Sequence, residues 1–109
     1  VDRQQLKRAI INLIDNAVSA TKDEGEITLK VSAKPDINKV YIKIADTGIG
    51  IKDEMKEKLF FPYFSTKKNG TGLGLAIVHR IITEHGGSIT VSDNSPKGTV
   101  FHIELPIRG

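Results

Sequence analysis

Two asparagines, Asn12 and Asn16, lie four residues apart in a segment whose apolar residues follow a helical period. This spacing puts the two amides one turn apart on the same side of a helix. Asparagine is unfavourable inside a helix because its side chain competes for backbone hydrogen bonds. A solvated helix edge is one interpretation of the pair. The other is an oxygen ligand for Mg²⁺, which accepts amide oxygens while keeping water and phosphate oxygens as further ligands.

A carboxylate and two glycines follow a predicted strand in the sequence Asp46-Thr47-Gly48-Ile49-Gly50. The glycines permit close approach of a ligand to the backbone. A carboxylate at this point can accept a hydrogen bond from the amino group of a nucleic-acid base. An ordinary Asp-x-Gly turn is the alternative, because a Gly-x-Gly pattern alone has little specificity.

Glycines alternate again in Gly70-Thr71-Gly72-Leu73-Gly74, which leads directly into a second long helical pattern. The free N–H groups and the dipole of a helix N-terminus attract phosphate. The segment is not a P-loop, because no Gly-Lys-Ser/Thr follows, and its spacing differs from the dinucleotide-binding fingerprint. It is either a phosphate-binding loop or a structural loop.

Most of the aromatic residues gather at Phe60, Phe61, Tyr63 and Phe64, just before Ser65-Thr66-Lys67-Lys68. They are either core residues or the hinge of a lid. In the second case a lysine of the segment moves onto phosphate charge when the lid closes.

Hydrophobic periodicity predicts the elements that position these residues. The first is a helix from Leu6 to Ala17, with Asp2 as its N-cap, and two strands over 26–32 and 40–46 follow it. A short helix capped by Asp53 then runs to Leu59, and a longer helix begins at Leu73 and is ended by His85-Gly86-Gly87. The last two elements are strands over 88–92 and 99–105. Short turns make the first two strands one antiparallel hairpin and the last two strands a second. We therefore expect an α/β (α+β) two-layer sandwich, with the helices covering one face of the sheet.

Composition bounds the function classes. The 109 residues predict one domain over 1–109, and the absence of cysteine excludes disulfides, thiol nucleophiles and Cys-ligated metals. The net charge of +3 comes from basic residues spread along the chain, which argues against nucleic acid as a partner. No apolar run approaches the length of about 20 residues that a membrane helix needs. His79, His85 and His102 are too scattered for a metal-ligand cluster.

The order of the motifs resembles the catalytic ATP-binding domain of bacterial sensor histidine kinases. The matching segments are the N box Asn12–Ala17, the first glycine box Asp46–Gly50, the F box Phe60–Phe64, the second glycine box Gly70–Leu75, and Gly98-Thr99 before the last strand. The resemblance implies the Bergerat ATP-binding fold of the superfamily that includes DNA gyrase, MutL and heat-shock ATPase chaperones, with a mixed, mostly antiparallel sheet. The sequence Phe64-Ser65-Thr66-Lys67 is most similar to that of the nitrogen-regulation and sporulation kinase branches.

By this resemblance Asn16 ligates Mg²⁺, Asn12 supports the triphosphate, and Asp46 binds the adenine amino group. Lys67 joins the two asparagines as a catalytic residue beneath a flexible lid. Ser19 and Ala20 stand where many relatives have lysine and an aromatic residue, which removes the usual phosphate and adenine contacts there. The other ATP-binding residues that the resemblance implies are Gly48, Gly50, Ile51, Phe64, Gly70, Thr71, Gly72, Leu73, Gly74, Leu75 and Thr99.

One residue separates two reaction types. Hydrolytic relatives place glutamate one turn before the metal-binding asparagine, where it acts as a general base. Here that residue is Asn12, which cannot take a proton, so phosphoryl transfer is favoured over hydrolysis. The alternatives are a nucleotide-binding regulatory module and an ATPase of the same superfamily.

The resemblance also predicts partners. None of the histidines has the sequence setting of a phosphoacceptor, so the acceptor is expected on a dimerisation and histidine-phosphotransfer domain of a longer protein. A response regulator would follow downstream. We expect the isolated chain to be a monomer with little activity alone, and to be cytoplasmic or the cytoplasmic part of a membrane-bound sensor.

Overall fold

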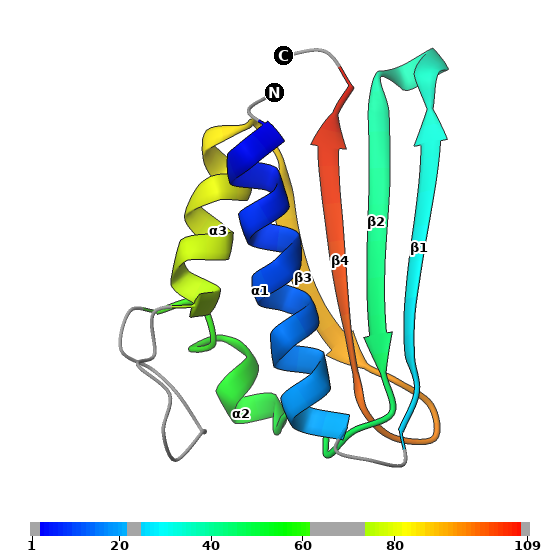
Figure 1. Cartoon of the computed structure of the whole chain (residues 1–109), viewed down its shortest axis with the longest axis vertical. Coiled ribbons are helices and arrows are strands. Elements are labelled where there is room, and N and C mark those ends of the chain that lie inside the picture. The colour runs from blue at the N-terminus through cyan, green and yellow to red at the C-terminus, as the bar shows by residue number, and fades with distance from the viewer. Residues whose placement is uncertain (1–2, 22–24, 62–73, 108–109) are drawn as a thin grey trace.

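A computed structural model describes residues 3–21, 25–61 and 74–107. The two long helices lie on one side of the sheet (Figure 1). The bounds are α1 Arg3–Thr21, β1 Ile27–Lys34, the 3₁₀ helix η1 Pro35–Ile37, β2 Lys39–Asp46, α2 Asp53–Lys56, α3 Gly74–Glu84, β3 Ser88–Asp93 and β4 Thr99–Pro106. The predicted N-cap, Asp2, lies outside the described residues.

The described strands form one sheet in the order β1-β2-β4-β3, and every neighbouring pair is antiparallel. Both predicted hairpins are confirmed, and so is the two-layer sandwich. The parallel pairing that a mixed sheet requires is not found among the strands described. Because β4 pairs with both β2 and β3, its first residue lies beside the last residues of the other two strands.

The core lies between the helices and the central strands. α1 packs against α3 and β2, and α3 packs against β3. The predicted helical stripes are buried, with Leu13 and Ile82 fully inside and Phe101 of β4 between the layers. Gly86 ends α3 in the left-handed region at φ 78°, and the N–H of Gly87 donates to the carbonyl of Ile82 at 3.0 Å, which confirms the predicted glycine cap.

β1 is less buried than its alternating sequence suggests. Leu29 and Val31 face the helix side of the sheet, because their cross-strand partners Ile44 and Ile42 do. Nevertheless Leu29 is 49% exposed and Val31 is 65% exposed, whereas Ile44 is only 1% exposed. The reason is that α1 packs mainly on β2 and only weakly on β1, so β1 lies at the sheet edge with little helix cover.

The short helix α2 differs from the prediction at both ends. Lys52 occupies the N-cap position, and Asp53 is the first helical residue. The carboxylate of Asp53 pairs with Lys56 three residues on, so it is not available to cap the helix. The helix ends at Lys56, and the chain continues to Phe61 in turns closed by 3.0 Å hydrogen bonds between residues three apart.

The burial difference across the first hairpin predicts unequal effects of truncation. Ile44→Ala should lower the free energy of unfolding by about 2 to 5 kcal/mol, because it removes a fully buried side chain. Leu29→Ala, directly opposite, should cost about 1 kcal/mol or less. Denaturant unfolding of both variants tests this expectation. Equal losses would contradict the uncovered position of β1.

Candidate functional site

The predicted nucleotide-binding residues that the structure describes gather at one end of the fold. β2 ends there with Asp46, and β4 begins there with Thr99. α3 begins at the same end with Gly74, and the C-terminal half of α1, which carries Asn16, also reaches it (Figure 1). Segments far apart in sequence are therefore brought to one edge of the sheet.

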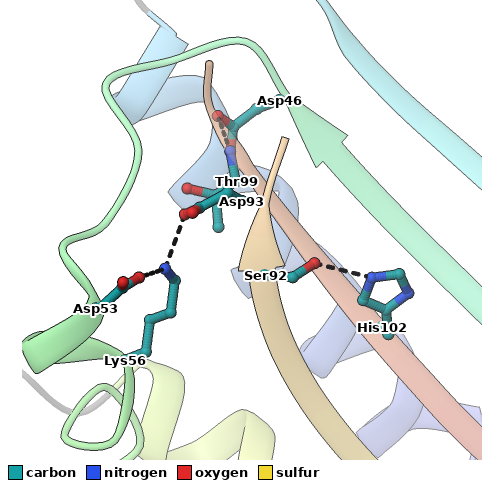
Figure 2. A network of polar contacts seen from close by, with 7 residues as sticks. All are labelled: Asp46, Asp53, Lys56, Ser92, Asp93, Thr99 and His102. Carbon is teal, nitrogen blue, oxygen red and sulfur yellow. Dashed lines mark hydrogen bonds and ion pairs between the residues drawn. The ribbon is translucent and has the colours of Figure 1, made fainter. Parts of the chain in front are cut away.

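Asp46 is the buried acid of this site, with only 2% of its surface exposed. Its Oδ1 accepts a 2.8 Å hydrogen bond from the N–H of Gly48. The same oxygen accepts a 3.3 Å hydrogen bond from the N–H of Thr99, which Figure 2 shows. These donors offset the cost of burying a charged carboxylate. Within the described residues both bonds end on Oδ1, so Oδ2 is the acceptor that can face a ligand.

The loop after β2 needs its glycines. Gly50 has φ 77°, in the left-handed region that favours glycine, and a Cβ on it would lie 3.5 Å from the carbonyl oxygen of Gly98. Thr47 fixes the start of the loop, since its N–H donates to the carbonyl of Glu26 at 3.1 Å and its hydroxyl accepts from the N–H of Glu26 at 2.9 Å. Ile51 then packs against the core.

Asn12 and Asn16 are both half-buried on α1, beside the fully buried Leu13 and Ala17. They lie at the margin of the core, and neither occupies a fully exposed helix edge. Within the described part of the chain, neither side-chain amide has a hydrogen-bond partner. The amide oxygens are of the type that Mg²⁺ accepts.

The glycine-rich segment before α3 is only partly described. Gly74 and Leu75 are the first two residues of α3, and a Cβ on Gly74 would meet nothing within 4 Å. The predicted site residues outside the described part are Phe64, Lys67, Gly70, Thr71, Gly72 and Leu73, and the predicted lid lies there with them.

The aromatic segment divides into two environments. Phe60 is half-buried against the core, with its ring centroid 6.4 Å from that of Phe101 and 5.4 Å from that of His79. Phe61 is 59% exposed. Phe60 is thus a core residue, as one of the two interpretations proposed, while Tyr63 and Phe64 lie outside the described residues.

A lysine joins α2 to the end of β3. The ammonium of Lys56 lies 2.8 Å from Oδ1 of Asp93 and also contacts the carboxylate of Asp53 (Figure 2). The hydrogen bond and charge of Lys56 lower the pKa of Asp53. Hydrogen bonds to Asp53 and then Asp93 raise the pKa of Lys56. The charged forms of Asp53 and Lys56 are therefore both favoured, although solvent screening keeps the energy of such surface pairs small.

Sequence reasoning missed one contact to the buried acid. The side-chain Nδ2 of Asn94, in the turn between β3 and β4, donates to the main-chain carbonyl of Asp46 at 2.8 Å. The turn composition predicted a turn at this place and nothing more. No local pattern could have paired two residues 48 positions apart, because the contact depends on the order of the strands.

An open groove of about 570 Å³ lies between the loop after β2 and the same turn. Residues 49–52, Met55, 93–94 and 96–98 line it. Gly50 and Ile51 are shared with the predicted site, but Asp46 does not line the groove, nor do Asn12, Asn16 and Thr99. The groove is therefore adjacent to the predicted site and is not identical with it.

Comparisons with known proteins agree with this geometry. The family described as histidine kinase-, DNA gyrase B- and HSP90-like ATPases matches residues 1–109. Sporulation kinase E of Bacillus subtilis is 43% identical over 104 residues, which are 95% of this chain and 14% of that protein. Sensor histidine kinase ZraS of Klebsiella oxytoca is 44% identical over 108 residues, 99% of this chain and 23% of that protein. The chain thus spans less than a quarter of these relatives.

Solved structures give the same result. The catalytic domain of histidine kinase ThkA has a TM-score of 0.89 at 41% identity, covering 99% of this chain and 70% of that one. ThkA in complex with the response regulator TrrA has a TM-score of 0.81 at 38% identity, covering 97% and 29%. Full-length ShkA in complex with AMPPNP has a TM-score of 0.81 at 33% identity, covering 94% and 21%.

The described helices include none long and apolar enough to cross a membrane. The motif order and the fold agree with both sets of comparisons. The chain belongs to the histidine kinase-, DNA gyrase B- and HSP90-like ATPase family, with the Bergerat fold, and within that family to the catalytic domains of sensor histidine kinases.

Proposed function

We propose that this chain binds Mg-ATP and donates the γ-phosphoryl group to a histidine on the dimerisation and histidine-phosphotransfer domain of its full-length protein. A response regulator then receives the phosphoryl group. The protein acts in the cytoplasm, either free or as the cytoplasmic part of a membrane-bound sensor.

The observation that carries the proposal is the burial of Asp46 together with its hydrogen-bond pattern. Its two described donors both bond to Oδ1, and Oδ2 is left to accept a hydrogen bond from the exocyclic amino group of adenine. A buried acceptor of this kind discriminates strongly, because a base that presents an acceptor in place of a donor leaves the carboxylate unpaired. Gly48 and Gly50 let the base approach the backbone.

The phosphates would lie towards α1 and α3. Asn16, with Asn12 one turn away, offers amide oxygens for Mg²⁺, and the N-terminus of α3 at Gly74 offers N–H groups for phosphate oxygens. The described residues contain no group of three or more acidic or histidine side chains able to hold a metal, so the ATP itself would supply further ligands. Bound Mg²⁺ would neutralise charge on the triphosphate. Lys67, which is outside the described residues, is proposed to bring a positive charge to the triphosphate.

Transfer is favoured over hydrolysis by the chemistry of Asn12. An amide cannot remove a proton from water, whereas a neutral imidazole nucleophile needs no strong base in this domain. None of the three histidines has the sequence setting of a phosphoacceptor: His79 is on the surface of α3, His85 after its end and His102 on β4. The acceptor is therefore expected on another domain. ShkA with AMPPNP and ThkA with its response regulator support the nucleotide and the partner proposed here.

Mixing the chain with a separately supplied acceptor helix hairpin and Mg-ATP tests this function. Acid-labile, base-stable phosphohistidine should accumulate on the hairpin, and a hairpin whose histidine is replaced by glutamine is the control. ATP binding with no phosphohistidine would favour the regulatory module instead. Steady phosphate release without a hairpin would favour the ATPase.

Asp46→Asn should reverse the preference for the base. The amide oxygen of the substituted side chain would take the place of Oδ1, where it accepts the two N–H groups, so the NH₂ group would face the amino group of adenine. The ATP affinity should fall by about 1 to 3 kcal/mol, while ITP, whose base has a carbonyl there, should lose little or gain. Calorimetric titration with both nucleotides measures this. Equal losses for ATP and ITP would make Asp46 a turn residue only.

Asn16→Ala should weaken nucleotide binding in Mg²⁺ more than in EDTA, because it removes an oxygen ligand of the metal. We expect roughly a tenfold loss in Mg²⁺ with no loss of the fold. Lys7→Ala is the matched control, since Lys7 is an exposed residue of the same helix. An Asn16 variant whose Mg²⁺ dependence equals that of the control would refute the ligand assignment.

A further inference from the structure

The turn between β3 and β4, residues 94–98, is fastened to the end of β2. The Nδ2 of Asn94 donates to the carbonyl oxygen of Asp46 at 2.8 Å. Asn94 is itself fixed, because its N–H donates to the carbonyl of Gly98 at 3.0 Å and its Oδ1 accepts from the N–H of Ser95 at 2.9 Å. With the amide oxygen engaged by Ser95, the NH₂ group must point towards Asp46.

The same turn meets Asp46 from a second side. Gly98 has φ 110°, and a Cβ on it would lie 1.9 Å from the carbonyl oxygen of Asp46. The next residue, Thr99, donates its N–H to the carboxylate of Asp46 at 3.3 Å. Asp46 thus accepts a hydrogen bond from Asn94 at its backbone and one from Thr99 at its side chain, and Gly98 allows the turn to lie close against it.

We propose that Asn94 is a positioning residue for nucleotide selectivity, a role that rests on the proposed binding of adenine by Asp46. In this role Asn94 acts through Asp46 and needs no contact with the nucleotide. It holds the peptide of Asp46 in the orientation in which Oδ2 points at the base. A hydrogen bond prefers an angle above about 150° and weakens steeply below about 120°. A rotation of this peptide that turns Oδ2 away from the base therefore lowers the discrimination.

A neighbouring residue provides the matched control. Asp93 fastens the same hairpin to α2 through Lys56 at 2.8 Å, but it has no described bond to Asp46. A variant at Asp93 therefore loosens the turn without releasing the peptide of Asp46. A merely structural turn would respond in the same way to changes at Asn94 and Asp93, whereas a positioning residue would not.

The experiment compares Asn94→Asp with Asp93→Asn in the whole chain. Asn94→Asp keeps the shape of the side chain but turns an acceptor towards the carbonyl of Asp46. We expect the ratio of ATP to ITP affinity to fall about fivefold in Asn94→Asp and to change less than about twofold in Asp93→Asn. Phosphoryl transfer to the acceptor hairpin should show a raised KM for ATP and an unchanged kcat.

Each outcome decides the inference. An unchanged ATP to ITP ratio, or an equal fall in both control and test variants, overturns the role of Asn94. If Asp46→Asn also leaves the ratio unchanged, the adenine role of Asp46 fails and the inference fails with it. A changed ratio in Asp46→Asn alone rejects the inference and leaves the proposed function standing. Asn94→Ala, which deletes the donor without adding charge, gives the same measurement where Asn94→Asp does not fold.

Discussion

The carboxylate of Asp46 is a charge held out of water, and much of the architecture follows from the donors that it requires. A buried carboxylate costs several kcal/mol unless N–H or O–H groups meet it. One donor, the N–H of Gly48, is local, but the other belongs to Thr99 on a different strand. The antiparallel pairing of β2 with β4 places that N–H beside the acid. The pairing of β2 with β4 that builds the sheet therefore also supplies a hydrogen-bond donor for the acid of the candidate site.

Local sequence patterns were sufficient for most of the fold. The apolar stripe through Leu13 and Ala17, the alternation in β2 and β4, and the glycine cap at Gly86 each result from forces between near neighbours in sequence. The failures have a common cause. Asp53 was predicted to cap a helix, but Lys56 competes for its carboxylate, and the exposure of β1 depends on where two distant helices pack. Neither effect is visible in a local period.

The candidate site, like the fold, could be predicted from the sequence only in part. Residue types alone suggested the amides of α1, the acid after β2 and the glycines around it, because their chemistry is unusual at those positions. Their gathering at one end required the strand order β1-β2-β4-β3, which no short-range pattern specifies. Asn94 is the clearest case. Its side chain is ordinary for a turn, and only the folded chain gives it Asp46 as a partner.

The exposure of the edge strand β1 affects self-association of the chain. A strand at the edge of the described sheet, with an apolar row at Leu29 and Val31, is a template for edge-to-edge aggregation. Lys30 and Lys34 lie on the other face of this strand and bring positive charge to the exposed edge. Their repulsion opposes self-association most strongly at low ionic strength and is screened by salt. Lys30 and Lys34 therefore favour dispersed copies of the chain, although they have no part in the proposed nucleotide chemistry.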